Sequence, residues 1–191
     1  VQGQYKMAEY FFKPLIIIWL MAWFVLQLRY IGNRLKKWII FALFFSWLGD
    51  VLLMFHLEDP LFFLLGLSSF LVAHIFYCIF FHLVRVKEMV KSRWYLLLIV
   101  ALYYAIVISI LSPYLGDMKL PVRIYAVVIS FMFLLAMHML FIKNKTTGLW
   151  MMAGALLFVV SDSFLAFNKF YQPFEMAGLF VMSTYGLAQL F

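Results

Sequence analysis

The chain has 191 residues, of which 68% are hydrophobic and 12% are charged. A soluble domain has about 45–50% apolar and about 25% charged residues, so this composition excludes a soluble fold and indicates a multi-pass membrane protein. The net charge of +7 does not indicate a nucleic-acid partner, because the basic residues form short clusters between apolar runs. Cys78 is the only cysteine, which excludes an intrachain disulfide.

Seven apolar segments are long enough to cross a membrane, which takes roughly 20 residues for about 30 Å of hydrocarbon. In chain order these segments are 8–28, 38–56, 60–83, 94–112, 121–142, 148–167 and 173–191. The connections between them are short, and none is long enough to form a second domain. We therefore expect an all-α fold in which residues 1–191 form one transmembrane helical bundle.

Basic residues are concentrated in alternate connections, namely 29–37, 85–93 and 143–145, which hold ten of the fifteen Lys and Arg residues. The positive-inside rule places these connections in the cytoplasm. Val1 would then lie on the opposite side, and a further helix before Val1 would return the N-terminus to the cytoplasm. Either a bacterial inner membrane or an organelle membrane fits this pattern.

Two carboxylates lie inside predicted spans, Asp50 in 38–56 and Asp162 in 148–167. An acid at this depth costs roughly 2.5–3.5 kcal/mol on insertion scales, so such a residue usually faces a polar interior and serves a function. At about 1.5 Å per residue, both carboxylates lie roughly 20 Å from the cytoplasmic edge, in the outer half of the membrane. Lys13 reaches a similar level in the first span, so we expect one polar layer to collect all three.

Small polar residues accompany both carboxylates. They are Ser46, on the helix face of Asp50, and Ser161, Ser163 and Asn168, which flank or follow Asp162. Gly49 would let a neighbouring backbone approach closely. These residues either bind substrate or form a hydrogen-bond network that only holds helices together, and two carboxylates at one depth favour a functional site.

His74 lies near the middle of the span 60–83, with Tyr77 one turn further along. Beside the carboxylates His74 is a candidate for positioning water, and the alternative is a hydrogen-bonded packing residue. No two histidines have the i, i+4 spacing of a helical zinc site. A metal centre built from Asp50, His74 and Asp162 is therefore not indicated, and we expect no cofactor.

Two basic residues lie near the expected outer edge, Lys13 and Arg123. Each could reach the headgroup layer by snorkelling or bind a substrate phosphate. Tyr185 and Gln189 are four residues apart on the last span, so they share a helix face and could offer a hydroxyl and an amide to a cavity. These four side chains complete the candidate substrate-binding set.

Five motifs follow one another along nearly the whole chain. They are Phe12-Lys13-Pro14-Leu15, Ser46-x-x-Gly49-Asp50, Phe70-x-x-x-His74-x-x-Tyr77, Phe158-x-x-Ser161-Asp162-Ser163 through Asn168, and Tyr185-x-x-Ala188-Gln189. In this order and at these spacings the motifs resemble the YhhN family, whose characterised members are lysoplasmalogenases. The family is usually drawn with eight spans, so the resemblance implies that the first of them is absent from this chain.

The resemblance implies an ether hydrolase that cleaves the vinyl ether bond of lysoplasmalogen (lysoplasmenyl-ethanolamine or -choline) to a fatty aldehyde and glycerophospho-ethanolamine or -choline. Protonation of a vinyl ether at carbon forms an oxocarbenium ion, which then adds water, so the reaction needs an acid and an anion. Asp50 and Asp162 suit these roles, in an order left open, because burial and mutual repulsion keep one of two neighbouring carboxyl groups protonated. The lysophospholipid substrate would enter sideways from the bilayer.

Two other functions use the same residues. A proton-coupled transporter would use Asp50 and Asp162 as a proton relay and would form no product. It is disfavoured because Gly and Pro, which interrupt transporter helices, are scarce in the spans that carry the carboxylates. A metal-dependent intramembrane hydrolase would bind zinc, and the scattered histidines argue against it.

Overall fold

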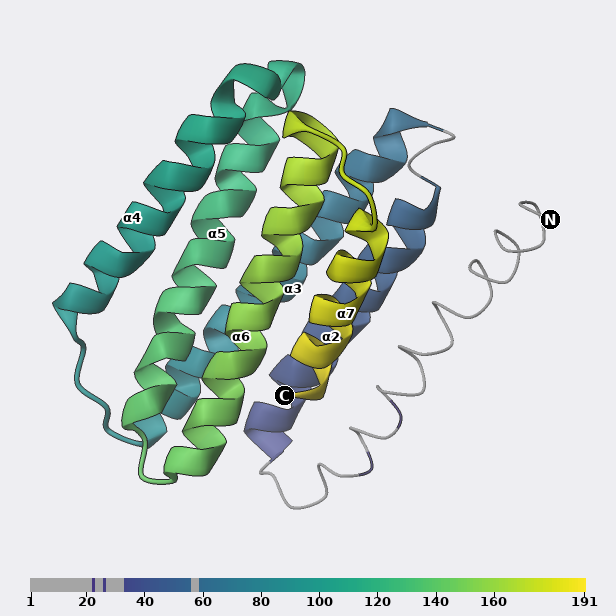
Figure 1. Ribbon diagram of the computed structural model, residues 1–191. Helices are drawn as coiled ribbons and strands as arrows, with labels where there is room; N and C mark the ends of the chain where they lie inside the picture. Colours follow the sequence, from purple (N-terminus) through teal and green to yellow (C-terminus); the bar gives the residue numbers. More distant parts are fainter. Residues whose placement is uncertain (1–21, 23–25, 27–32, 56–58) are drawn as a thin grey trace. The chain divides into compact units, whose positions relative to one another are not determined.

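The computed structural model describes residues 22, 26, 33–55 and 59–191, and every regular element in this part of the chain is a helix (Figure 1). The long helices are α2 (Asn33–Met54), α3 (Pro60–Lys87), α4 (Trp94–Leu111), α5 (Lys119–Met137), α6 (Lys145–Ala166) and α7 (Ala177–Leu190). The short segments are η2 (Ser112–Tyr114), η3 (Gly116–Met118), η4 (His138–Phe141) and the π-helix η5 (Phe167–Tyr171). The all-α prediction is confirmed for these residues, and the expected span at 8–28, which includes Lys13, lies outside them.

Among the residues that the structure describes, five helices are long and apolar enough to span a membrane, as expected of an integral, multi-pass membrane protein. They are Leu35–Met54, Pro60–Lys87, Trp94–Tyr114, Gly116–Phe141 and Lys145–Tyr171. Their outer surfaces are apolar: on α4, Leu97, Leu98 and Leu102 are all exposed. A continuous apolar surface of this kind is stable against lipid rather than water.

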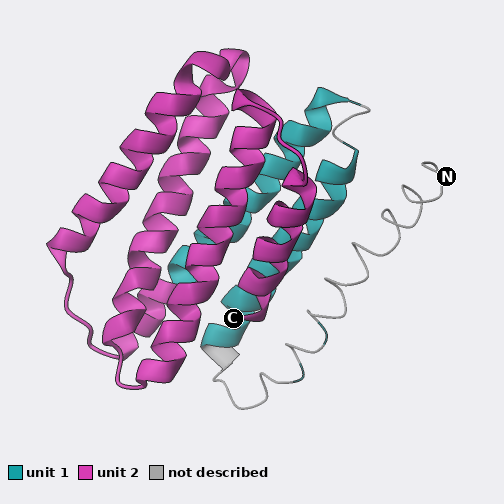
Figure 2. Ribbon diagram, in the orientation of Figure 1, with its two compact units in different colours: residues 1–80 teal, residues 81–191 magenta. Residues whose placement is uncertain are grey.

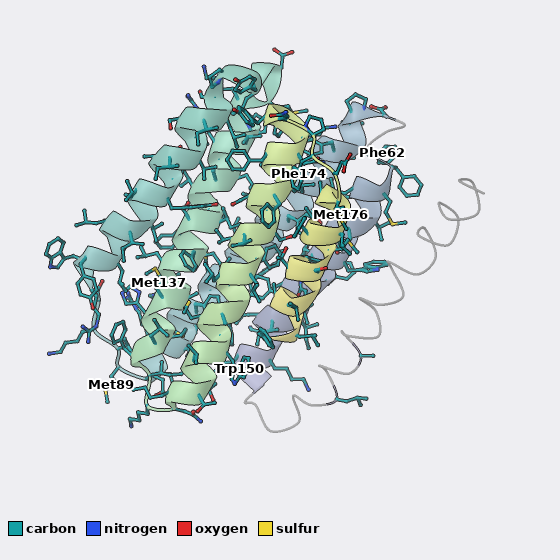
Figure 3. The ribbon with its side chains drawn as sticks, in the orientation of Figure 1. Phe62, Met89, Met137, Trp150, Phe174 and Met176 are labelled. Atoms are coloured by element: carbon teal, nitrogen blue, oxygen red, sulfur yellow. The ribbon has the colours of Figure 1, made fainter. Side chains whose placement is uncertain are left out.

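The last predicted span, 173–191, is shorter in the structure than the sequence indicates. α7 has 14 residues, fewer than the roughly 20 that cross a bilayer at normal incidence. Gln172 is extended (φ −152°, ψ 119°), which is the conformation that a following proline favours by steric clash. Helix resumes only after Met176, which has a left-handed φ of 62° and lies with Phe174 in the connection between α6 and α7 (Figure 3).

The chain divides into two compact units, residues 1–80 and residues 81–191 (Figure 2). The expected single domain over 1–191 stays a prediction. Each unit is built from antiparallel helices whose backbones approach closely at glycine.

In the first unit, α2 packs against α3. A Cβ atom at Gly66 would lie only 3.2 Å from the carbonyl oxygen of Gly49, so the predicted close backbone approach at Gly49 is confirmed. The ring of Phe70 covers the other side of Gly49, where a Cβ atom would lie 2.6 Å from the ring. The hydroxyl of Ser69 donates to the carbonyl oxygen of Phe45 at 2.7 Å. These contacts hold α2, which carries Asp50, against α3.

In the second unit, α4, α5, α6 and α7 lie in chain order, each packed against the next (Figure 2). The backbones of α6 and α7 approach where a Cβ atom at Gly154 would lie 3.1 Å from the carbonyl oxygen of Ala188. Towards the start of α6, the ring of Trp150 packs against Phe191 with 4.7 Å between centroids (Figure 3). α7 and the C-terminal residue thus pack against α6, the helix that carries Asp162.

The start of α4 is fastened to the end of α5 by His138. This side chain is buried, and its Nδ1 lies 2.7 Å from the carbonyl oxygen of Leu134, which can only accept a hydrogen bond. Nε2 therefore is the acceptor for the backbone N–H of Arg93, at 3.2 Å. The guanidinium of Arg93 lies 3.8 Å from the ring centroid of Phe141. The ring of His138 thus joins the end of α5 to the residue that precedes α4.

Candidate functional site

Asp162 lies on α6, well inside the apolar segment Lys145–Tyr171. It is 17 residues after Lys145 and 9 before Tyr171, so at about 1.5 Å per residue it is roughly 26 Å from the first end and closer to the second. Its side chain is half-buried in the second unit. The partners of a carboxylate at this depth decide what chemistry it can perform.

The hydroxyl of Tyr125 on α5 donates a hydrogen bond to Oδ2 of Asp162. α5 and α6 are antiparallel neighbours, so the fifth residue of the predicted span 121–142 meets a residue near the end of α6. A phenolic hydroxyl has an apolar ring that suits the helix interface and a donor that reaches the carboxylate. This pair is the polar centre of the candidate site.

A second tyrosine reaches the same region from α4. The hydroxyl of Tyr103 lies 2.9 Å from Oγ of Ser163. Ser163 gives its own proton to the carbonyl oxygen of Val159 at 2.7 Å, so Tyr103 is the donor in the pair. The hydroxyl of Tyr103 is also near enough to Asp162 for the two groups to interact electrostatically.

α7 supplies the fourth side of the site. Oγ of Ser161 donates to the backbone carbonyl oxygen of Val181 at 3.0 Å, which joins α6 to α7 at the residue before Asp162. Tyr185 is buried edge-on against the ring of Phe158, with 5.3 Å between centroids, and it interacts electrostatically with Tyr125. The hydroxyl groups of Tyr125 on α5 and Tyr103 on α4 therefore lie near the carboxylate of Asp162 on α6, and Tyr185 on α7 lies near Tyr125.

The other candidate residues of the second unit lie further from Asp162. Asn168 is in η5, and its Oδ1 accepts the backbone N–H of Phe174 at 3.3 Å, which anchors the connection to α7. Arg123 is exposed near the start of α5 and donates to Oγ of Ser112 at 3.0 Å. Gln189 lies one turn beyond Tyr185 on α7 and is half-buried. Their substrate-binding roles stay predictions.

The candidates of the first unit are distributed along α2 and α3. Gly49, the residue before Asp50, contacts Gly66 and Phe70 of α3. Asp50 therefore lies at about the level of residues 66–70 of α3. Counted from residue 68, the middle of that stretch, His74 and Tyr77 lie about 9 Å and about 14 Å further along α3, towards Lys87, at about 1.5 Å per residue. The role of His74 or Tyr77 in positioning water stays a prediction.

Ser46 and His74 are both fully buried. Among the residues that the structure describes, Oγ of Ser46 has no hydrogen-bond partner. A buried hydroxyl without a partner is uncommon, and a water molecule or a substrate group commonly satisfies such a group. In the described segments 33–55 and 59–191, no three His, Cys, Asp or Glu side chains gather as a metal ion would require.

Tyr103 and Tyr125 are not among the site residues predicted from the sequence. Neither residue belongs to a local motif, and tyrosines within apolar helices are common in a chain that has 11 of them. The depth argument used for the charged residues could have found Tyr125, because Tyr125 lies four residues from the start of 121–142 and Asp162 lies five residues from the end of 148–167, so the two depths are similar. Only the helix packing indicates Tyr103.

Comparison with known proteins identifies the family. The model of the YhhN family matches residues 8–191. A human protein named Lysoplasmalogenase TMEM86A is 32% identical over 155 residues, which are 80% of this chain and 62% of the relative. Human Lysoplasmalogenase TMEM86B is 34% identical over 151 residues, covering 78% of this chain and 58% of the relative, and the TMEM86B of Sus scrofa is 34% identical over 150 residues with the same coverage.

The chain spans about three fifths of the length of these curated relatives. No solved structure matches the chain significantly. The family match covers nearly all of the sequence and includes the α5, α6 and α7 segments that surround Asp162. The chain belongs to the YhhN family.

Proposed function

We propose that this protein hydrolyses the vinyl ether bond of lysoplasmalogen (lysoplasmenyl-ethanolamine or -choline), releasing a fatty aldehyde and glycerophospho-ethanolamine or -choline. The observation that carries the proposal is Asp162, an intramembrane carboxylate that accepts a hydrogen bond from Tyr125 in a site lined by hydroxyl groups. The relatives named lysoplasmalogenases support the choice of substrate.

The reaction suits two carboxyl groups. One donates a proton to the β-carbon of the vinyl ether, which leaves an oxocarbenium ion between the α-carbon and the ether oxygen. The other stabilises this cation and takes a proton from the water that adds to it. The resulting hemiacetal breaks into aldehyde and alcohol. Glycosidases divide the same two tasks between paired carboxyl groups.

We assign the two tasks to Asp50 and Asp162, which the sequence places at one depth. His74 or Tyr77 would orient the water, and Lys13 and Arg123 would bind the phosphate. The exposed guanidinium of Arg123 supports its part, since Arg123 lies near the start of α5, two residues or about 3 Å along the helix axis before Tyr125.

The small side chains Ser46, Ser161, Ser163 and Asn168, together with Tyr185 and Gln189, would shape and line the binding region. We further propose that the basic connections 29–37, 85–93 and 143–145 face the cytoplasm. The polar headgroup would then lie near the outer end of α5, and the single hydrocarbon chain would enter between helices from the bilayer.

Aldehyde release tests the proposal. Purified protein is incubated with a vinyl-ether lysolipid and, separately, with the ester lysolipid of the same chain and headgroup. We expect aldehyde from the vinyl ether, no hydrolysis of the ester, and the same rate with and without a chelator. Folded protein that releases no aldehyde would contradict the proposal, and a rate that falls with chelator would indicate metal-dependent hydrolysis instead.

One observation favours a second candidate, a proton-coupled transporter. α6 passes into the π-helix η5, and α7 begins after five non-helical residues, 172–176, so the end of the chain resembles an interrupted helix. In this case Asp50 and Asp162 would carry protons. Protein reconstituted in liposomes would then give proton flux coupled to a solute and no aldehyde.

A further inference from the structure

We propose that one end of the second unit, formed by the connections 88–93 and 142–144 and the residues next to them, binds the headgroup of an anionic phospholipid in the surrounding bilayer. We call this surface the basic end. It consists of exposed or half-exposed basic side chains around an exposed methionine, namely Arg85, Lys87, Met89, Lys91, Arg93, Lys143 and Lys145. This inference goes beyond the proposed hydrolysis and does not rest on it.

The two connections lie side by side although they are far apart in the sequence. The backbone N–H of Lys143 donates to Oε2 of Glu88 at 3.2 Å, and these residues are 55 positions apart. The guanidinium of Arg93 lies 3.8 Å from the ring centroid of Phe141. Its Nη1 also donates to the hydroxyl of Tyr95 at 2.9 Å, which fixes its direction further. The basic side chains of both connections therefore belong to one surface.

The basic end lies at the boundary of the apolar segments. Two of these segments end here, at Lys87 and Phe141, and two begin here, at Trp94 and Lys145. Trp94 is 75% exposed at the first position of its segment, where an indole ring suits the level of the headgroups. Phospholipid phosphates lie just outside the hydrocarbon, so lysine and arginine side chains at this boundary can reach them.

The charge of the basic end is almost entirely positive. Residues 81–100 and 138–150 contain six Lys and Arg residues and one carboxylate, Glu88, which accepts the backbone N–H of Lys143. The opposite end of the second unit is more balanced, because residues 112–123 and 166–176 contain three basic residues and two carboxylates. Each Lys or Arg near an anionic membrane surface strengthens binding about fivefold. The basic end therefore favours an anionic headgroup over a zwitterionic one.

Met89 adds an apolar contact to this surface. It lies in the connection between α3 and α4, with a side chain that is 80% exposed (Figure 3). Its backbone is left-handed (φ 54°) and closes α3, with its N–H donating to the carbonyl oxygen of Val86 at 3.1 Å. Glycine is the usual residue at such a position, because a Cβ atom makes the left-handed conformation less favourable. An unfavourable backbone that exposes an apolar side chain indicates a contact outside the protein, and acyl chains below the headgroups supply one.

Competition between two lipids tests the inference. The full chain, purified in a neutral detergent, is mixed with equal amounts of phosphatidylglycerol and phosphatidylcholine that have the same acyl chains. Native mass spectrometry then gives the ratio of the two lipids in complexes that hold one lipid. We expect phosphatidylglycerol to predominate. Equal binding of the two lipids would overturn the inference, and so would displacement of phosphatidylglycerol by an equal concentration of soluble glycerol 3-phosphate.

The double variant Lys91→Gln with Lys143→Gln tests the role of charge. At about fivefold for each charge removed, it should lower the lipid ratio about 25-fold, whereas the charge-preserving variant Lys91→Arg with Lys143→Arg should keep the wild-type ratio. Lys119→Gln is the matched control, because Lys119 is exposed at the start of α5, at the opposite end of the second unit. An unchanged ratio in the double variant would overturn the inference, as would an equal loss in Lys119→Gln.

The Met89→Gly variant tests the apolar contact. Loss of the buried thioether side chain should lower the amount of bound phosphatidylglycerol about tenfold, and Met89→Leu should restore it. Met176→Gly is the matched control, since Met176 is also left-handed (φ 62°) and 64% exposed but lies next to Glu175 at the opposite end. Glycine relieves the backbone at both positions, so unfolding would not explain a loss. Wild-type binding by Met89→Gly would contradict the part of Met89.

The lipid experiment and the aldehyde assay fail independently. Lys91, Lys143 and Met89 lie outside the candidate functional site, so their variants should release aldehyde at the wild-type rate in phosphatidylcholine micelles. Absence of aldehyde from the wild-type protein would contradict the proposed function and leave the lipid ratio to decide the basic end.

Discussion

Replacing Gly148 by alanine should destabilise the second unit by obstructing the contact between α6 and η4. A Cβ atom at this position would overlap the carbonyl oxygen of Met139 and lie 3.1 Å from Cγ1 of Ile142. Met139 is fully buried, and a backbone carbonyl cannot rotate away as a side chain does. Overpacking of this kind costs about 1–3 kcal/mol, and the better helix propensity of alanine offsets at most about 1 kcal/mol of it.

The matched control is Gly186→Ala on α7, where a Cβ atom would meet no other atom within 4 Å. Only the propensity gain of about 1 kcal/mol applies there. Because a backbone carbonyl obstructs the new methyl group in Gly148→Ala, the upper end of the overpacking range applies, and about 3 kcal/mol less about 1 kcal/mol leaves about 2 kcal/mol. At about 2–4 °C per kcal/mol for a chain of this size, the Tm of Gly148→Ala should fall by about 4–8 °C and that of Gly186→Ala should rise by about 2–4 °C.

The assay uses the single cysteine of the chain. Cys78 is half-buried, so a dye that fluoresces on reaction with thiols reports unfolding of purified protein during heating. A Tm for Gly148→Ala equal to or above that of the wild type would refute the close backbone contact between α6 and η4. A fall for Gly186→Ala as large as that for Gly148→Ala would show that glycine itself, rather than the contact, determines stability.

Three further substitutions test the packing around the site. His138→Leu removes both hydrogen bonds of the ring and should lower stability by about 1–3 kcal/mol in the same thermal assay, whereas an unchanged Tm would mean that these bonds contribute nothing. Gly154→Leu should separate α7 from α6 and lower both the Tm and the rate of hydrolysis. A variant with the wild-type Tm and the wild-type rate would contradict the close backbone contact between Gly154 and Ala188. Ser161→Ala removes the hydrogen bond to the carbonyl oxygen of Val181 and should lower the free energy of unfolding by about 1 kcal/mol. The pH dependence of the hydrolysis rate should not change, and a shift in it would indicate that Ser161 takes a direct part in the chemistry.

Much of the fold could be predicted from hydropathy, because a membrane requires long apolar helices whose ends are marked by charge and proline. The predicted span 94–112 and the observed α4 (Trp94–Leu111) agree to within one residue. The span 173–191 was predicted too long, because its composition is apolar throughout while the local sequence Gln172-Pro173 delays the helix to Ala177. Apolar composition determines where a chain can enter lipid, and backbone sterics determine where its helices begin.

The sequence was sufficient to predict the carboxylate of the candidate site, Asp162, but not the tyrosines that surround it, Tyr125 and Tyr103. Asp162 stands out because a charge in an apolar helix is costly, so a single residue carries the information. Tyr125 and Tyr103 carry no such cost, since a phenol suits lipid, interface and interior alike. Their importance depends on the rotation of α4 and α5 about their own axes, which is set by packing between helices rather than by any local pattern. Ser163 was predicted as a substrate contact, and this role stays a prediction; the structure bonds Ser163 to Tyr103 and Val159.

The measurement that tests the central claim most directly is the turnover of a vinyl-ether lysolipid by the D50N and D162N proteins. Asp117→Asn is the control, because Asp117 lies exposed in η3, outside the predicted site. Since acid–base groups contribute about 10²–10⁴-fold, we predict that each intramembrane substitution lowers the rate by at least about a hundredfold, with unchanged Tm, while the control retains full activity. Wild-type turnover by folded D162N protein would contradict the account.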